Sequence, residues 1–236
     1  MQVELVMLYW TDGLPDSTRT RNCKFTWQNL QRLEQYLKDN NVDIVCKLID
    51  FSPTKIIEDC TEHDPYPLSV FKKSEKINKS LNKSNSDFFG IIDSDAFISD
   101  DQYNTILELC NILKKSDVYT FDLKDIENTG EVINYDDGTF NRENVTFSSR
   151  YPDGANPGLG GAWLSCTDTL KSFGGFNEEF TGWGGEDGEV FGKLWMDGNV
   201  NTVKNWGDIN VWHLPHFCDR ENSLYFNREE YQRLNF

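Results

Sequence analysis

The sequence has no long hydrophobic run. Its longest uninterrupted apolar stretch, Leu5 to Trp10, covers six residues, whereas a helix that spans a membrane needs about 20. The first ten residues read as the start of a strand and contain no basic segment followed by an apolar core, so they do not indicate a signal peptide. We therefore expect a soluble, cytoplasmic protein with no membrane span.

Basic residues are few. The chain has 23 Lys and Arg against 39 Asp and Glu, which gives a net charge of −16. Such a balance argues against a nucleic-acid binder, because no basic surface is present to displace counterions, and against docking on an anionic membrane. An acidic chain can still bind a nucleotide when a divalent metal bridges the two negative charges.

Cysteine and histidine are also scarce. The six cysteines are widely spaced and contain no C-x-x-C pair, which indicates reduced thiols in a cytosolic protein. Only three histidines occur, and two of them, His213 and His216, lie within the last thirty residues. Few imidazoles are therefore available for chemistry.

What the chain does contain is a regular alternation of secondary-structure patterns. Its 236 residues suit one domain. The first half predicts strands over 3–10, 42–49, 88–92 and 118–121, and helices over 21–40, 69–83 and 103–115. This order favours an α/β fold with a mostly parallel central sheet flanked by helices. The second half predicts hairpin strands around 132–133 and 145–147, a short strand after the glycines within 158–165, helices over 167–173 and 187–197, and short strands over 200–203 and 210–212.

The first candidate site follows the strand over 88–92. Asp93 and Asp95 end this apolar strand and would point the same way if the chain stays extended. Paired carboxylates suit Mg²⁺ or Mn²⁺, which keep positions open for phosphate oxygens, and ligands of parallel sheets bind beyond the carboxyl ends of strands. Either His213 or His216 could complete the site. The alternatives are a surface turn or helix cap for the acids, and a histidine with ordinary hydrogen bonds.

The second candidate site is the stretch from Gly182 to Glu189. Glycines on both sides of Trp183 allow a tight turn and a close approach to a ligand. Glu186 and Asp187 follow at once, and neighbouring carboxylates raise each other's pKa toward the range of a general base. A charged helix N-terminus would explain Asp187 and Glu189, but not the preceding Gly-Trp-Gly-Gly.

Three stretches, taken in order, resemble the GT-A class of nucleotide-sugar glycosyltransferases. Residues 71–81 followed by 87–95 are similar to the helix and strand that lead to the D-x-D metal motif of β-1,4-galactosyltransferases. Residues 160–165 and 173–180 are similar to a segment shared with chondroitin polymerases. Residues 182–194, with His213 downstream, resemble the W-G-G-E-D motif and final metal-binding histidine of these families.

The resemblance implies a set of roles. Asp95, helped by Asp93 and His213, would bind Mn²⁺ or Mg²⁺ on the donor diphosphate. Asp187 would be the general base. The acceptor site would contain Trp183, Gly185 and Glu186, and the nucleotide-sugar site would contain Arg19, Arg21, Asp50, Phe71, Lys73, Asp93 and Gly161.

The activity implied is metal-dependent transfer of a sugar from a nucleotide-sugar, by family habit a UDP-sugar, to a hydroxyl of a glycan or other acceptor. The resemblance also divides the single domain, residues 1–236, into a nucleotide-binding part over about 1–100 and an acceptor-binding part over about 101–236. The usual membrane stem of Golgi enzymes is absent, which suggests either a soluble bacterial, phage or viral enzyme of carbohydrate biosynthesis or a piece of a longer chain. For each lysine singly, a solvated helix face is the alternative to a nucleotide contact.

Three other readings stay open. The E-D-G-E pattern at 186–189 echoes the W-G-G-E-N-x-E of retaining N-acetylgalactosaminyltransferases, although Asp at 187 favours a base and thus inversion. A non-catalytic carbohydrate-binding protein could keep the same fold. A metal-dependent phosphohydrolase or nucleotidyltransferase would need a second acidic cluster or a basic phosphate loop, and neither is evident.

Overall fold

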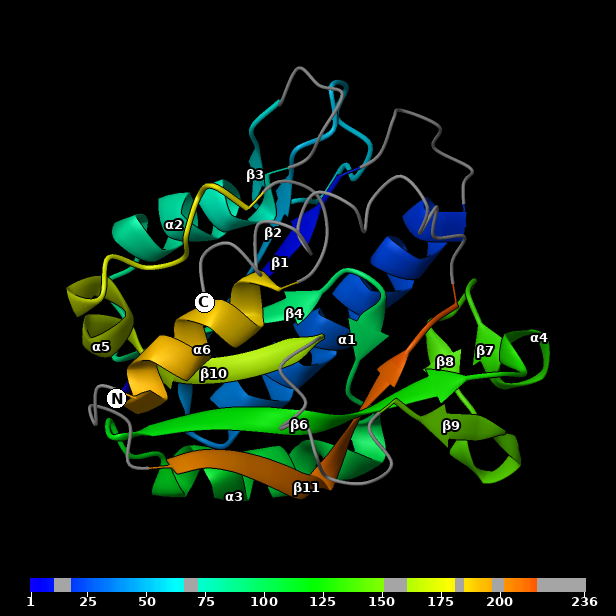
Figure 1. The fold of residues 1–236 in the computed structure, drawn as a ribbon. Coiled ribbons are helices and arrows are strands. Elements are labelled where there is room, and N and C mark those ends of the chain that lie inside the picture. Colours follow the sequence, from blue (N-terminus) through cyan, green and yellow to red (C-terminus); the bar gives the residue numbers. More distant parts are fainter. Residues whose placement is uncertain (11–17, 66–71, 151–160, 181–184, 197–201, 216–236) are drawn as a thin grey trace.

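The computed structural model describes residues 1–10, 18–65, 72–150, 161–180, 185–196 and 202–215. Figure 1 shows a central sheet with helices on both faces. The strands of this sheet are β1 Gln2–Tyr9, β2 Asp43–Asp50, β3 Glu62–His63, β4 Phe88–Asp93, β5 Ala96–Phe97, β6 Asp117–Ile126, β9 Phe147–Ser149, β10 Ala162–Cys166 and β11 Thr202–His213. The helices are α1 Thr18–Asp39, α2 Lys73–Lys83, α3 Tyr103–Ile112, α4 Thr129–Val132, α5 Thr167–Ser172 and α6 Glu186–Met196.

The sheet is mixed, but most of its strands run in one direction. Its order is β3-β2-β1-β4-β10-β6-β11-β5, with β9 paired to β6. Strands β3, β2, β1 and β4 are parallel neighbours, and β10 is antiparallel to both β4 and β6. Strand β6 therefore runs in the same direction as β4, and β11 is parallel to β6. The predicted α/β class with a mostly parallel sheet is confirmed, with β5, β9 and β10 running the opposite way.

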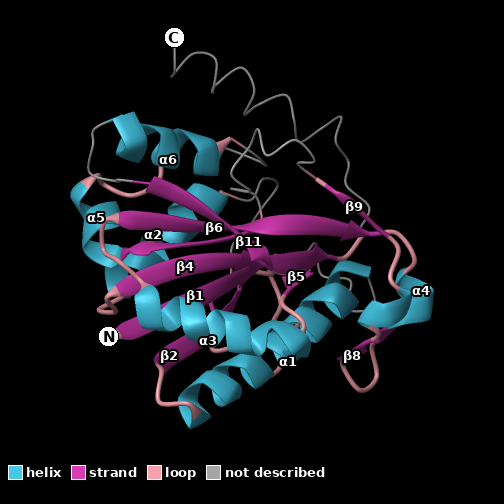
Figure 2. Ribbon diagram, turned by 90° about the horizontal axis from the view of Figure 1, so that it is seen from below, coloured by secondary structure: helices cyan, strands magenta, loops and turns pink. Residues whose placement is uncertain are grey.

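Two apolar layers cover the sheet. Helices α1 and α3 pack on one face, where Leu30, Leu33 and Leu109 join a cluster with residues of β1 and β2. Helices α2, α5 and α6 pack on the other, where Ile77 and Phe191 join a second cluster. Figure 2 shows the sheet between these two groups of helices. Strand β4 is buried on both faces, as expected for the centre of such a sheet.

The contact between β4 and β10 requires a glycine. A side-chain carbon at Gly90 would lie 2.5 Å from the backbone oxygen of Trp163. No rotation of a side chain could relieve that clash, because the nearest atom belongs to the backbone. Gly90 therefore brings β10 close to the strand that carries Asp93 at its end.

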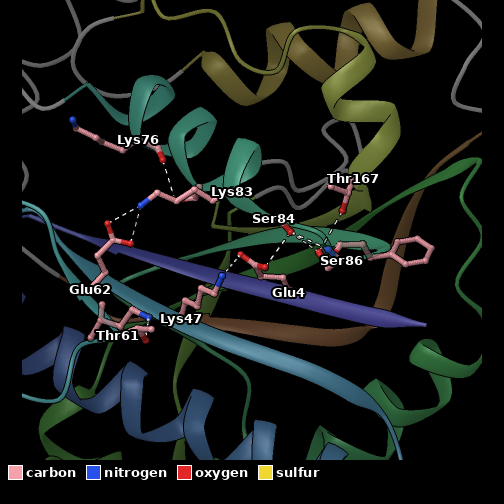
Figure 3. Close-up of polar contacts among 12 residues, drawn as sticks. Glu4, Lys47, Thr61, Glu62, Lys76, Lys83, Ser84, Ser86 and Thr167 are labelled. Atoms are coloured by element: carbon pink, nitrogen blue, oxygen red, sulfur yellow. Dashed lines mark hydrogen bonds and ion pairs between the residues drawn. The ribbon is translucent and has the colours of Figure 1, made fainter.

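A buried polar network lies near the amino ends of β1 and β4 (Figure 3). Glu4 on β1 is 6% exposed and forms an ion pair of 2.9 Å with Lys47 on β2. The Ser84 hydroxyl donates to Glu4 at 3.0 Å and lies 2.7 Å from the Ser86 hydroxyl. The network ties the turn between α2 and β4 to β1, far along the strands from their carboxyl ends.

Two predicted regions differ from the structure. The strands expected around 132–133 and 145–147 do not form a hairpin together. Instead β7 Ile133–Asn134 pairs with β8 Thr139–Phe140, while β9 lies along β6. The described parts of the short strands expected at 200–203 and 210–212 belong to one strand, β11, whose register shifts between Trp206 and Asn210. Residues 200 and 201 lie outside the described residues. A bulge absorbs the residues that look like a turn in the sequence.

Candidate active site

The candidate site lies at the carboxyl ends of the parallel strands, where the fold rule places it. Asp93 is the last residue of β4 and His213 is the last residue of β11. Glu186 and Asp187 begin α6, and Lys73 begins α2. Residues that are far apart in the sequence therefore meet at one edge of the sheet.

Lys73 joins three carboxylates. Its Nζ atom lies 3.2 Å from Asp93 Oδ1, 3.1 Å from Glu186 Oε1 and 3.8 Å from Asp187 Oδ2. Glu186 and Asp187 are only 3% and 8% exposed. One cation thus partly balances three acidic groups that come from two other elements.

Burial and charge shift the pKa values of this cluster. Burial raises the pKa of Asp187 to about 8, with Lys73 opposing the rise and the charges of Glu186 and Asp93 adding to it. Burial alone would lower the pKa of Lys73, but Asp93, Asp187 and Glu186 outweigh it and hold that pKa well above its ordinary value. Asp187 therefore titrates in the range that a general base requires.

Glu186 has one oxygen left over. Its Oε1 atom contacts Lys73, whereas its buried Oε2 atom has no hydrogen-bond partner in the described part of the chain. Buried carboxylate oxygens are normally paired, because leaving them unpaired is costly. A hydroxyl group of a ligand would satisfy this oxygen.

His213 lies among a second group of polar side chains. Its Nε2 atom is 3.5 Å from Asp95 Oδ1, and its Nδ1 atom is 2.9 Å from Asp125 Oδ1 and 2.9 Å from Arg150 Nη2. Strand pairing sets this arrangement, because His213 is in register with Asp125 on β6 and with Ala96 on β5. The backbone N–H of Leu214 also donates to the carbonyl of Asp95 at 2.8 Å.

The groups around Nδ1 determine which nitrogen of the His213 ring carries the proton. If the Nδ1–H group donates to Asp125, the lone pair of Nε2 faces Asp95, as metal ligation requires. Burial acts to raise the pKa of Asp125, but hydrogen bonds from His213 and Arg150 outweigh it and hold that pKa well below its ordinary value. Asp125 is thus a charged acceptor behind the ring.

Asp95 and His213 could hold a divalent cation, and Asp93, the third predicted metal ligand, contacts Lys73. Within the described residues, no three His, Cys, Asp or Glu side chains come together as a metal-holding group. Two protein ligands suit Mg²⁺ or Mn²⁺, which take their other ligands from water and phosphate. Of the two predicted histidines, His213 contacts Asp95, and His216 lies outside the described residues.

The remaining predicted donor-site residues are less closely grouped. Asp50 is fully buried at the end of β2, where its carboxylate accepts the N–H groups of Ser52, Ile56 and Ile57 at 2.8–3.1 Å. It therefore folds the loop after β2. The Arg21 guanidinium lies 5.4 Å from the centre of the Tyr135 ring. Arg19 is exposed in the first turn of α1, and Phe71 and Trp183 lie outside the described residues.

Two predicted glycines adopt conformations that other residues rarely adopt. Gly161 has φ +101°, and its carbonyl accepts the N–H of Asp93 at 2.7 Å. Gly185 has φ +94°, and its carbonyl accepts the N–H of Glu189 at the start of α6. Gly161 therefore helps to position Asp93, with which it pairs, and Gly185 helps to position Glu186 and Asp187, which follow it.

Sequence reasoning missed Trp163, Asp125 and Arg150. Trp163 donates its indole N–H to Asp187 Oδ1 at 3.0 Å, yet in the sequence it looks like any core aromatic residue. Asp125 was missed because the strand was expected to end at 121, whereas β6 continues to Ile126. A longer strand would have placed Asp125 at the carboxyl edge, so the strand-end rule could have found it. Arg150 carries no such signal.

Part of the chain is similar to a known protein family, and its fold is similar to known structures. Residues 143–211 match the model of a family described as the N-terminal domain of galactosyltransferase. A comparison with curated protein sequences found no match. The catalytic domain of Drosophila β1,4-galactosyltransferase 7, solved with xylobiose, is 14% identical with a TM-score of 0.52, over 98% of this chain and 79% of that one.

Two further solved structures share the fold. S. aureus TarS in complex with UDP-GlcNAc is 14% identical with a TM-score of 0.60, over 99% of this chain and 64% of that one. GalNAc-T7 with UDP, GalNAc and Mn²⁺ is 12% identical with a TM-score of 0.55, over 92% of this chain and 43% of that one. These neighbours are GT-A glycosyltransferases.

In the part of the chain that the structure describes, no helix combines the length and the apolar character needed to cross a membrane.

The matched galactosyltransferase segment contains Trp163, Asp187 and most of β11. The chain therefore has the GT-A fold of these structures, and part of it matches the galactosyltransferase family model.

Proposed function

We propose that this protein transfers a sugar from a nucleotide-sugar donor to a hydroxyl group of a glycan acceptor, with the help of a divalent metal and with inversion at the anomeric carbon. The observation that carries the proposal is Asp187, a buried carboxylate at the carboxyl ends of the parallel strands, whose pKa is raised to about 8. TarS was solved with UDP-GlcNAc, and GalNAc-T7 was solved with UDP, GalNAc and Mn²⁺, which supports a UDP-sugar donor and manganese here.

Donor binding is assigned to the residues at the ends of β4 and β11. Asp95 and His213, 3.5 Å apart, would hold the metal, which stabilises the charge of the departing diphosphate when bound. Asp93 would act beside them through its contact with Lys73. The residues assigned to the rest of the donor site are Arg19, Arg21, Asp50, Phe71, Lys73 and Gly161.

Proton removal is assigned to Asp187. The acceptor oxygen forms a bond to the anomeric carbon as the bond from that carbon to the diphosphate oxygen breaks. Attack from the face opposite the leaving group inverts the configuration. Asp187 takes the proton of the acceptor hydroxyl, and the diphosphate leaves with the electron pair of the broken bond.

The acceptor pocket is assigned to Trp183, Gly185 and Glu186. The buried, unpaired Oε2 atom of Glu186 would accept a hydrogen bond from a sugar hydroxyl next to the reacting centre. Such a contact orients the sugar and contributes to catalysis through positioning.

The test is a panel of UDP-sugars with Mn²⁺, scored by UDP release and by the anomeric configuration of the product in NMR spectra. We expect transfer with inversion from at least one donor. Asp187→Asn should lower kcat by about 10²–10⁴-fold, the range typical of general-base removal, with donor affinity near that of the wild type.

Asp168→Asn is the matched control, because Asp168 is an exposed acid in the first turn of another helix, α5. It should leave turnover unchanged. Full turnover in Asp187→Asn would exclude this residue as the base, and retained configuration in the product would show a retaining enzyme.

A further inference from the structure

Trp163 is the aromatic residue that contacts the proposed base. It lies in the middle of β10 and is 1% exposed. Its indole N–H donates to Asp187 Oδ1 at 3.0 Å. A buried indole N–H normally finds a partner, but a carbonyl or hydroxyl would serve that need equally well. Here the partner is the one carboxylate to which proton removal is assigned.

The position of the Trp163 ring is determined by packing on more than one side. Phe176 stacks on it at 5.4 Å between ring centres, and Phe191 of α6 meets it edge-on at 5.1 Å. Its backbone is held in the sheet between β4 and β6, where Trp163 is in register with Ile91 and Thr120. The N–H donor therefore has little freedom to follow a moving carboxylate.

The two oxygens of Asp187 consequently differ. Oδ1 accepts the indole hydrogen bond, whereas Oδ2 lies 3.8 Å from Lys73 Nζ, which is longer than a hydrogen bond. A proton that arrives at Asp187 goes to Oδ2, because Oδ1 already faces a donor.

We propose that Trp163 is a positioning residue for the transfer reaction, which holds Oδ1 of Asp187 so that Oδ2 faces the acceptor hydroxyl. The inference rests on the proposed function for its catalytic meaning. It goes beyond the W-G-G-E-D resemblance, because Trp163 lies on another strand, 24 residues before the base. The hydrogen bond also favours the ionised carboxylate over the acid, since the indole can only donate.

The first experiment is the kinetics of Trp163→Phe, which keeps an aromatic ring in the cluster and removes only the N–H group and part of the ring volume. We expect kcat to fall about tenfold or more, with KM for the donor changed less than about twofold. We also expect the pH of half-maximal kcat to rise by about one pH unit, because a hydrogen bond to a charged group is lost.

Phe176→Leu is the matched control, since Phe176 packs on the same ring and offers no hydrogen-bonding side-chain group to Asp187. It should lower the Tm as much as Trp163→Phe does, without moving the pH profile. If both variants lose equal activity at an unchanged pH profile, Trp163 is only a core residue and the inference fails. In a double variant with Asp187→Asn, Trp163→Phe should cause no further loss of kcat.

The second experiment does not need a substrate. The indole N–H resonance of Trp163, assigned by its disappearance in Trp163→Phe, should titrate with pH in the wild type and stay constant in Asp187→Asn. A resonance that ignores pH in the wild type would overturn the contact itself. A titrating resonance in a protein that transfers no sugar would overturn the catalytic role and would count against the proposed function, not against the contact.

Discussion

At the scale of single residues, the site separates two carboxylate groups with different tasks. Glu186 and Asp187 are buried beside Lys73. Asp95 lies beside His213 instead. The separation matters because a carboxylate that binds a metal is a poor base, whereas a buried carboxylate with one cation near it keeps its affinity for a proton.

The raised pKa of Asp187 predicts an effect on stability. Between pH 4 and pH 8 the folded state keeps a proton on Asp187 that the unfolded state has lost, so the free energy of unfolding falls as pH rises through this window. Lys73, Glu186, Asp93 and the Trp163 N–H are the groups that surround it. Asp187→Asn removes the ionisation, so the variant should become steadily more stable than the wild type from pH 4 to pH 8.

Urea denaturation at several pH values measures this difference, which changes by up to about 1.4 kcal/mol for each pH unit. Above about pH 8 the difference should become constant. Asp168→Asn should show no such trend, because Asp168 is exposed. A constant difference between Asp187→Asn and the wild type across the whole window would contradict the raised pKa.

A second residue-scale prediction concerns Asp125. Its carboxylate lies 2.9 Å from His213 Nδ1 and orients the ring. Asp125→Asn keeps the size of the side chain but removes its charge, so Mn²⁺ affinity in the presence of UDP should fall about 10–100-fold, as for other residues behind metal-ligating histidines. Isothermal titration calorimetry measures this. Ser148→Ala, in register with Asp125 on β9, should bind Mn²⁺ normally, and equal affinities in both variants would refute the role.

At the scale of elements, helix α2 contacts both the carboxylate cluster and the segment that precedes α6. Lys73 at its start contacts the carboxylates, and Asn78 one and a half turns later binds the segment that precedes α6. The Asn78 side chain donates to the carbonyl of Phe176 and accepts its N–H, both at 2.7 Å. Gly175 makes this approach possible, because a side-chain carbon there would lie 2.3 Å from Asn78 Oδ1.

Asn78→Ala should therefore cost about 1–3 kcal/mol of stability, because it leaves both backbone groups of Phe176 buried without a partner. It should also lower kcat, since Phe176 supports the ring of Trp163. Thermal and urea denaturation check the first effect. Asn82→Ala, an exposed asparagine on the same helix, is the control and should change neither quantity.

At the scale of the whole molecule, charge governs how a nucleotide can bind. The chain carries a net charge of −16, and its candidate site contains Asp93, Asp95, Glu186 and Asp187. A diphosphate is repelled from such a site unless a cation lies between them.

We also propose that residues 1–100 and 101–236 act as nucleotide-binding and acceptor-binding parts, although the pair of Asp95 and His213 spans both.

UDP should accordingly bind at least about tenfold more tightly with Mn²⁺ than with EDTA, because the ion offsets the repulsion between like charges. Calorimetry with UDP in the two buffers measures the ratio. Asp95→Asn should weaken binding in Mn²⁺ far more than in EDTA. Equal UDP affinity in both buffers would exclude a bridging metal.

The fold was largely predictable from the sequence because its signals are local. The apolar run at 88–92 and the acids after it follow from neighbouring residues, and so does the helix predicted from residue 187, which begins one residue earlier, at Glu186. The pairing of β9 with β6 and the continuity of β11 were not predictable, because they depend on which strand lies alongside. Trp163 and Arg150 were missed for the same reason, whereas Asp125 was missed because its strand was expected to end at residue 121.

By itself, the sequence determined the order of the motifs, the alternation that builds a mostly parallel sheet, and the residue types that a metal and a base require. Only the tertiary structure decided that Lys73 joins Asp93 to Glu186 and Asp187, that Asp125 lies behind His213, and that Trp163 donates to Asp187. Helix and strand propensities arise between residues a few positions apart. Contacts across the sheet arise from the packing of whole elements, and that packing sets the distances on which the chemistry depends.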